Sequence, residues 1–158
     1  MLRLMHGDRK GRKKLKQNEF HTLKGYQLIA DEGFTPAMED YLEMICRILG
    51  ENGNVRAREL SECLNVKPSS TSKMVRHLHM TGYLSAEKYG IISLTEKGKA
   101  AGNYLLYRHD VIHKFLCFLN GTESELEETE KIEHFLSRKT VQNMDRLLRE
   151  GTKTLPKT

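Results

Sequence analysis

The feature that most constrains the fold is a helix, a break, a second helix and a hairpin, in that order, between residues 58 and 94. Residues 58–65 carry a short helical apolar pattern that ends before Pro68, and residues 69–80 carry a second one. Residues 83–94 have the composition of two short strands joined by a turn at Tyr89 and Gly90. Because a β-hairpin directly follows a helix-turn-helix, we predict a winged helix-turn-helix module.

The second helix of this pattern has one small, polar and basic face. Positions i, i+3, i+4 and i+7 of that face are Ser69, Ser72, Lys73 and Arg76. Val75 and Leu78 point to the opposite face, toward a core. Small hydroxyl residues allow a helix to approach duplex DNA closely, and Lys and Arg reach phosphates or guanine edges. An ordinary solvated helix face is the alternative, and the hairpin that follows favours DNA binding.

Helices are also expected on both sides of this module. Thr35 followed by Pro36 is typical of a helix start, and an apolar stripe continues from there to Gly50. Thr95 can cap a long helix that breaks at Asn120 and Gly121. Two further helices are predicted over residues 123–136 and 138–150, with Ser137 as a cap between them and Gly151 as a stop. The expected fold is therefore mainly α.

Four segments follow from this pattern. We expect a basic, partly disordered extension over 1–34, the winged helix-turn-helix domain over 35–103, a helical metal-binding and dimerisation domain over 104–151, and a tail over 152–158. Three helices of this size cannot enclose a full core alone. Their surplus apolar surface predicts a homodimer.

A group of acidic and histidine residues recurs at helical spacing outside the reading helix. In a helix that the capping pair Thr122 and Glu125 would open, positions i, i+3 and i+4 are Glu130, Glu133 and His134. Asp40 and Glu43 repeat the i, i+3 spacing, and His109 lies on an otherwise apolar helical face. Singly, such residues are usually a solvated face or a hydrogen-bonded core histidine. Together with a DNA-binding pattern they favour a metal site.

Charge and cysteine content narrow the setting. Residues 1–24 hold eight Lys or Arg against two Asp or Glu, a net charge of +6, whereas residues 25–158 have a net charge of −1. Such an arm either binds nucleic acid phosphates or is simply solvated. Cys46, Cys63 and Cys117 are expected to be reduced core thiols. With no signal peptide and no apolar run that could span a bilayer, we expect a cytoplasmic protein without a membrane partner.

Several short strings of residues together resemble one known family. These strings are Thr35 to Glu43, Pro68 to Ser70, Lys73 to Val75, Tyr107 to His109 and Ile132 to His134. They are similar to the diphtheria-toxin-repressor family of metal-dependent regulators, in its short manganese-responsive branch without an SH3-like third domain. The resemblance covers about residues 35–150.

The resemblance implies a paired-metal site and a DNA-reading surface. The implied metal ligands are Asp40, Glu43, His109, Glu130, Glu133 and His134. The residues expected to contact DNA are Pro68, Ser69, Ser70, Ser72, Lys73, Arg76 and Lys88. The iron-responsive branch has sulfur ligands where this chain has Asp40 and Glu133. A set of carboxylates and imidazoles suits Mn²⁺ better, with two ions per subunit, although other divalent cations would bind.

By the same resemblance, the expected function is that of a manganese-responsive repressor. It would bind palindromic double-stranded operator DNA as a metal-activated homodimer and control metal-uptake genes. An iron- or zinc-responsive regulator and a metal-independent winged-helix regulator are alternatives. A di-metal hydrolase is a third, but the sequence has no separate nucleophile or oxyanion motif, so we expect no enzyme. The wing tip at Tyr89, Gly90 and Ile91 lacks the basic residue often seen in the family, which leaves Lys88 as the expected phosphate contact.

Overall fold

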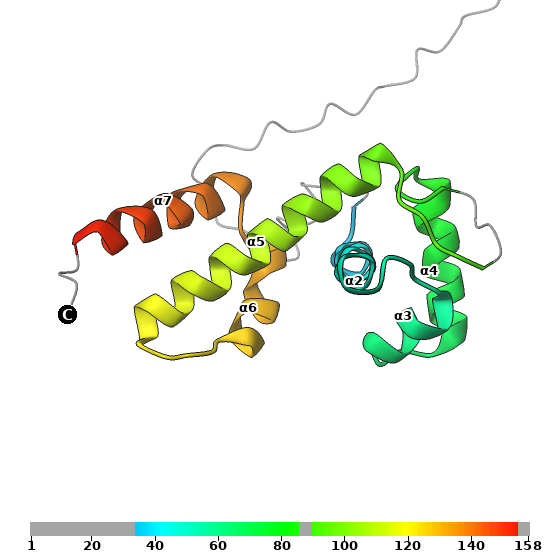
Figure 1. The fold of residues 1–158 in the computed structure, drawn as a ribbon, viewed down its shortest axis with the longest axis horizontal. Coiled ribbons are helices and arrows are strands. Elements are labelled where there is room, and N and C mark those ends of the chain that lie inside the picture. The colour runs from blue at the N-terminus through cyan, green and yellow to red at the C-terminus, as the bar shows by residue number, and fades with distance from the viewer. Residues whose placement is uncertain (1–33, 86–89, 155–158) are drawn as a thin grey trace, which may run out of the picture. The chain divides into compact units, whose positions relative to one another are not determined.

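A computed structural model describes residues 34–85 and 90–154 of the 158-residue chain (Figure 1). The predictions for the basic extension, for Lys88 and for the end of the tail lie outside the described residues. The described part is mainly helical, as predicted. Its elements are α2 (Pro36–Asn52), α3 (Ala57–Cys63), α4 (Pro68–Met80), α5 (Glu96–Asn120), α6 (Leu126–Ile132), the 3₁₀ helix η1 (Glu133–Phe135) and α7 (Arg138–Thr154).

Helix α2 begins where the sequence predicted and ends slightly later. The Thr35 hydroxyl accepts a hydrogen bond from the Met38 amide at 3.3 Å, and Pro36 occupies the first turn, where its missing N–H costs nothing. The expected end at Gly50 is wrong, because the helix continues to Asn52. Gly53, at φ 73°, supplies the left-handed residue that ends it, and its amide donates to the Leu49 carbonyl.

The helix-turn-helix is formed by α3 and α4. Pro68 was expected to separate the two helices but instead starts α4, since the fixed φ of proline fits the first helical position. The turn before it contains Asn65 at φ 52°, a left-handed conformation that asparagine tolerates. Val75 and Leu78 are buried, as predicted, and the opposite face of α4 is exposed.

The wing follows α4. Leu84 forms an antiparallel bridge with Leu94, and the Ser85 amide donates to the Ser93 carbonyl at 2.9 Å. A further bridge joins Ile92 to Val55, just before α3. Over 81–85 and 90–95 the pairing consists of isolated bridges, so within these residues the ladder is shorter than the predicted hairpin. A helix-turn-helix followed by this wing confirms the predicted winged helix.

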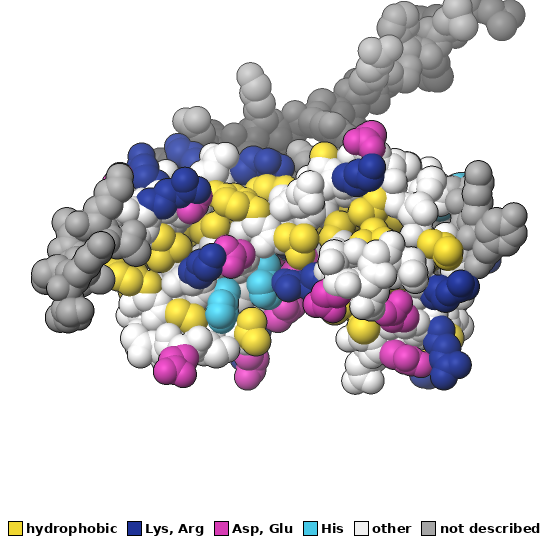
Figure 2. Space-filling model, in the orientation of Figure 1, with side chains coloured by type: hydrophobic (Ala, Val, Ile, Leu, Met, Phe, Trp, Pro, Cys, Tyr) yellow, Lys and Arg dark blue, Asp and Glu magenta, His cyan; other side chains and the backbone are white. Residues whose placement is uncertain are grey.

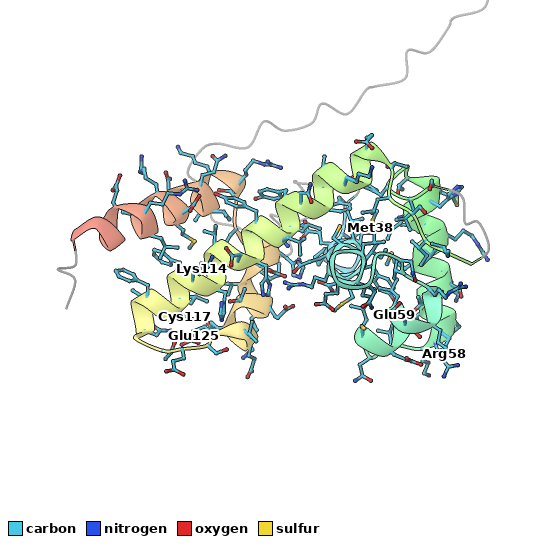
Figure 3. All side chains as sticks on the ribbon, viewed as in Figure 1. Met38, Arg58, Glu59, Lys114, Cys117 and Glu125 are labelled. Carbon is cyan, nitrogen blue, oxygen red and sulfur yellow. The ribbon has the colours of Figure 1, made fainter. Side chains whose placement is uncertain are left out.

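Two apolar clusters lie along α5. The larger one belongs to the winged helix and includes residues that are essentially inaccessible, such as Met38, Leu42, Leu60 and Leu78 (Met38 is labelled in Figure 3). Leu105 of α5 completes it. The smaller cluster joins α5 to α7 and consists of Val111, Ile112, Leu116 and Val141. Because α5 contributes to both clusters without a break, it is a continuous support for both halves.

Helices α2 and α5 cross closely at Gly102. A Cβ atom at this position would lie 2.0 Å from the Sγ atom of Cys46 on α2, so a larger residue would clash. Burial raises the pKa of the Cys46 thiol to about 11, which keeps it protonated. The expectation of core thiols is correct for Cys46 and wrong for Cys63, which is exposed at the end of α3. Cys117 is half-buried.

The last helices differ in detail from the prediction. Thr95 caps α5 by accepting from the Gly98 amide at 3.0 Å, and Gly121 ends it at φ 66°. The expected helix over 123–136 is shorter. It begins at Leu126. The Thr122 hydroxyl donates to the Glu125 carboxylate (Glu125 is labelled in Figure 3), whereas a capping hydroxyl would accept a hydrogen bond from a backbone amide. It then narrows to a 3₁₀ turn from Glu133.

Helix α7 starts at its predicted cap and continues past its predicted stop. Ser137 accepts from the Thr140 amide at 3.2 Å, and the helix runs through Gly151 to Thr154. A glycine ends a helix only where the chain takes a left-handed turn, and here the turn is absent over the described residues 138–154. None of the described helices combines the length and the apolar composition that crossing a membrane requires.

Candidate metal centre

Acidic and histidine side chains from three parts of the chain meet beside α5. Asp40 and Glu43 come from α2, His109 from α5, and the last group from the α6–η1 junction. That group is Glu130, Glu133 and His134. Figure 2 shows histidine, acidic and basic side chains side by side in this region of the surface. The structure thus brings together all six residues that the sequence analysis singled out as candidate ligands.

The donor atoms form two groups that share one carboxylate. Asp40, Glu133 and His134 form the first group, and Glu43, His109 and Glu133 form the second, with the donor atoms of each group within 4.8 Å of one another. In the first, the Nε2 atom of His134 lies 3.0 Å from Asp40 Oδ1. In the second, the Nδ1 atom of His109 lies 3.0 Å from Glu133 Oε2. Glu133 therefore belongs to both candidate donor groups.

Glu130 and Glu133 differ in burial although they lie one helical turn apart. A regular helix would have put Glu130, Glu133 and His134 on one face, as predicted. In the structure Glu133 is 1% exposed, whereas the side chain of Glu130 is 60% exposed. Glu130 still reaches the second group, where its Oε1 atom lies 3.6 Å from His109 Nδ1. Glu133 is therefore a buried candidate ligand, whereas Glu130 lies at the rim of the site.

Burial and neighbouring charge set the protonation of the second group. The hydrogen bond to Glu133 raises the pKa of His109, and the nearby Glu43 carboxylate raises it further. Burial raises the pKa of Glu43, with the Glu133 charge adding to the effect, although a hydrogen bond from Arg47 opposes it. Arg47 donates through its Nε atom to Glu43 Oε1 at 3.1 Å. Two buried carboxylates are thus held close together, with an arginine partly neutralising them.

The first group is supported by a pair of charged residues that the sequence analysis did not single out. The Nδ1 atom of His134 lies 2.6 Å from Glu39 Oε2, and an Nη2 atom of Arg108 lies 2.8 Å from the same oxygen. Burial would raise the pKa of Glu39, but the hydrogen bonds from His134 and Arg108 outweigh it and lower that pKa. Hydrogen bonds to Asp40 and then to Glu39 raise the pKa of His134 to about 10.

Sequence reasoning missed Glu39, Arg47 and Arg108 for a common reason. Each is next to a candidate ligand in the chain or one helical turn away from it. At these positions neither the residue type nor the spacing distinguishes it from an ordinary charged residue of the helix. A usable signal existed for Glu39 and Arg108, which are the immediate neighbours of Asp40 and His109. A ligating imidazole usually donates its second N–H to a carboxylate, so an additional acid beside a ligand is a candidate partner.

The residues present fit a divalent cation. The donors are four carboxylates and two imidazoles, and none of the six is sulfur. Oxygen and imidazole nitrogen suit Mn²⁺ and also accommodate Zn²⁺ or Co²⁺. A cavity of about 190 Å³ opens onto this region and is lined by Asp40, Glu43, Met44, Arg47, Leu64, Glu130 and Glu133. A cation held here would neutralise carboxylates that otherwise repel one another.

The exposed face of α4 lies in the same half of the protein as α2. The residues of this face that the sequence analysis singled out are all exposed, namely Pro68, Ser69, Ser70, Ser72, Lys73 and Arg76. The Ser72 hydroxyl donates to the Pro68 carbonyl at 3.0 Å, which keeps the side chain close to the helix. A groove of about 430 Å³ separates this face from the wing and is lined in part by Ser72, Arg76 and Ser85.

The fold and this site together define a class of protein: a winged helix-turn-helix followed by a helical domain, with a cluster of candidate cation-binding side chains where the two adjoin. Residues 33–92 match the family model described as iron dependent repressor, N-terminal DNA binding domain. Residues 95–154 match the one described as iron dependent repressor, metal binding and dimerisation domain. The chain belongs to this family of metal-dependent regulators, which confirms the resemblance found in the sequence.

Solved structures of similar proteins agree with this assignment. The manganese regulator SloR is 30% identical, with a TM-score of 0.64 over 73% of this chain and 54% of its own. The metal-dependent transcriptional regulator MtsR is 26% identical, with a TM-score of 0.67 over 73% of this chain and 54% of its own. ScaR with bound Zn²⁺ is 30% identical, with a TM-score of 0.61 over 71% and 53%. The chain therefore spans about half the length of these proteins.

Proposed function

We propose that the protein is a manganese-responsive transcriptional repressor that binds operator DNA as a metal-activated homodimer. One observation carries this proposal: donors from α2, within the winged helix, meet donors from α5 and the α6–η1 junction in two groups that share Glu133. A cation bound there would tie the DNA-binding half to the rest of the protein. Membership of the iron-dependent repressor family supports it.

Electrostatics explains how a cation would act. Asp40, Glu43, Glu130 and Glu133 are the four acidic candidate ligands. Carboxylates this close repel one another, and protonation or movement apart relieves the repulsion when no cation is bound. A divalent cation removes the repulsion and favours the arrangement in which α2 and η1 are close. Metal binding is thereby coupled to the position of α2, and through the winged-helix core to that of α4.

The geometry of duplex DNA explains why this position matters. Two copies related by a two-fold axis read a palindromic site only when their reading helices lie about 34 Å apart, one turn of the duplex, or a multiple of it. A dimer that visits this spacing part of the time binds with an affinity reduced by the competent fraction. The metal is then a corepressor. The exposed face of α4 would contact DNA together with Lys88 of the wing, and the genes controlled would be those for metal uptake.

The choice of metal follows from the donor set. Six oxygen and nitrogen donors with a shared carboxylate suit two Mn²⁺ ions per subunit. The similar protein SloR is named a manganese regulator, which supports the same choice here. The similar protein ScaR has been solved with bound Zn²⁺, which supports a zinc-responsive regulator as the second candidate. Titration of the protein with Mn²⁺, Fe²⁺ and Zn²⁺, each with DNA binding as the readout, separates these.

The test is DNA binding with and without Mn²⁺. Duplexes are first selected from a random-sequence library by the full-length protein with Mn²⁺, and their affinity is then measured by fluorescence anisotropy. We expect binding about 5- to 150-fold tighter with Mn²⁺ than with a chelator, the usual size of such coupling. Glu133→Gln should remove this difference, and Glu128→Gln, an exposed acid on α6, should leave it unchanged. Equal affinity with metal and with chelator would refute the proposal.

A further inference from the structure

One carboxylate in the metal centre differs from the other four. Oε2 of Glu39 is already shared between two donors, His134 Nδ1 at 2.6 Å and Arg108 Nη2 at 2.8 Å. We propose that Glu39 is not a metal ligand but a positioning residue, held by Arg108, that fixes the ring of His134 so that its Nε2 atom faces the cation. This inference rests on the proposed function, since it concerns the same site.

The two nitrogens of His134 have different surroundings. Nδ1 faces Glu39, whereas Nε2 faces Asp40 Oδ1 at 3.0 Å and lies 3.9 Å from Glu133 Oε1. Asp40 and Glu133 form the candidate donor group with His134. An imidazole that donates Nδ1–H to Glu39 presents the lone pair of Nε2 toward that group. A carboxylate on the far nitrogen also makes the imidazole a stronger ligand, as is common for metal-bound histidine.

Arg108 explains why Glu39 stays out of the donor group. Its side chain is 4% exposed, and its Nη2 atom lies 2.8 Å from Glu39 but 4.0 Å from Glu133. Within the described residues its Nε atom is buried without a hydrogen-bond partner. A buried guanidinium with one donor unpaired is costly, and the ion pair with Glu39 offsets part of that cost. The ion pair with Arg108 neutralises Glu39 and leaves it less attractive to a cation than its neighbour Asp40.

The same three residues connect three elements. Glu39 is on α2, Arg108 on α5 and His134 on η1. They therefore fix the ring of a ligand relative to both the winged helix and the long helix before a cation arrives. A pre-oriented imidazole loses less freedom when it binds, which raises affinity without adding a ligand.

The direct test is NMR of the full-length protein labelled with ¹⁵N-histidine and loaded with ¹¹³Cd²⁺. A nitrogen bonded to cadmium shows a one-bond coupling to ¹¹³Cd, and a protonated nitrogen shows one to hydrogen. For His134, assigned through its own backbone, we expect the cadmium coupling at Nε2 and the proton at Nδ1. Cadmium coupling at Nδ1 would overturn the inference while leaving a metal site in place. If neither His109 nor His134 couples to cadmium, the proposed metal centre is wrong as well.

Substitution provides a second readout. Glu39→Gln keeps an oxygen that can accept from Nδ1 but removes the charge, and it should weaken ¹¹³Cd²⁺ binding about tenfold while the coupling stays at Nε2. Glu39→Leu removes the acceptor, so the coupling should spread to Nδ1. Glu51→Gln, an exposed acid at the end of the same helix, is the matched control and should bind as the unmodified protein does. Unchanged affinity in Glu39→Gln would contradict the inference, and circular dichroism verifies that each variant is folded.

Discussion

The two halves of the protein differ in how completely each encloses its own core. The winged helix buries twelve apolar residues in one cluster, many of them fully inaccessible. The C-terminal half buries four, Val111, Ile112, Leu116 and Val141. It also exposes most of the large apolar side chains that remain on the described surface: Phe118, Leu119, Leu126, Phe135 and Leu147. The first half encloses its own apolar core, whereas the second leaves apolar surface that the proposed homodimer would cover.

The largest effect should come from making a cavity in the core of the winged helix. Leu42 is 0% exposed in the winged-helix cluster, and Leu42→Ala should lower the free energy of unfolding by about 2–5 kcal/mol, the usual cost of a core cavity. Denaturant unfolding followed by circular dichroism measures this. Val141→Ala in the small cluster removes less volume and should cost about half as much or less. A larger loss for Val141→Ala would contradict the comparison.

Metal should stabilise the protein through the acidic centre. A ligand that binds only the folded state adds about 2.7 kcal/mol at a concentration of one hundred times its Kd. The melting temperature of the unmodified protein should therefore be higher with Mn²⁺ than without it. Because Glu133 belongs to both donor groups, Glu133→Gln should abolish the shift, and Glu43→Gln, which affects one group, should reduce it. An equal loss in both variants would mean that the two groups do not bind separately.

A close contact between α2 and α5 should be sensitive to one methyl group. The Cβ of an alanine at position 102 would lie 2.0 Å from Cys46 Sγ, so α2 and α5 must separate in Gly102→Ala. We expect a loss of about 1–3 kcal/mol of unfolding free energy, typical of overpacking. The double variant Gly102→Ala/Cys46→Ala, which removes the clashing sulfur, should recover part of it. If the double variant is no more stable than Gly102→Ala, the clash with Cys46 Sγ is not the cause of the loss.

Exposed apolar residues should matter for association in one half only. Leu119 is 65% exposed on α5 and Met80 is 76% exposed on α4. Under the proposed homodimer, Leu119→Glu should raise the dimer Kd by about tenfold, equivalent to about 1.4 kcal/mol. Met80→Glu is the control from the other half and should leave association unchanged. Analytical ultracentrifugation measures the dimer Kd of both variants. Equal effects would contradict the expectation that association depends on the C-terminal half alone.

The smallest effect concerns the link between α5 and α7. The Tyr107 hydroxyl donates to Asp145 at 2.9 Å. A hydrogen bond from Arg149 lowers the pKa of Asp145, and the Tyr107 bond lowers it further. A lowered pKa means that the contribution to stability is present above the ordinary value near 3.8 and is lost as the pH falls below it. Asp145→Asn should lower the melting temperature by about 2 °C or less at pH 7, and by less at a pH well below 3.8.

Much of this arrangement could be predicted from local sequence signals. Thr35 with Pro36, Thr95 and Ser137 each start a helix where they were expected to, because a capping side chain acts on backbone amides within three residues. Gly121 ends α5 for an equally local reason. The ends at Gly50 and Gly151 were wrong, since a glycine permits a left-handed turn without requiring one.

The sequence by itself determined the helices, the winged helix and the residue types of the six candidate ligands, because periodicity and capping are properties of neighbouring residues. Only the tertiary structure decided how the acids divide. Glu133 is buried and belongs to both donor groups, whereas Glu130, one helical turn before it, lies at the rim. Arg108, far from Glu39 in the chain, forms an ion pair with the Glu39 carboxylate. The adjacent Asp40 has no such arginine partner among the contacts of the described residues and belongs to a candidate donor group. The role of a carboxylate depends on which charges surround it in space, and helical spacing does not contain that information.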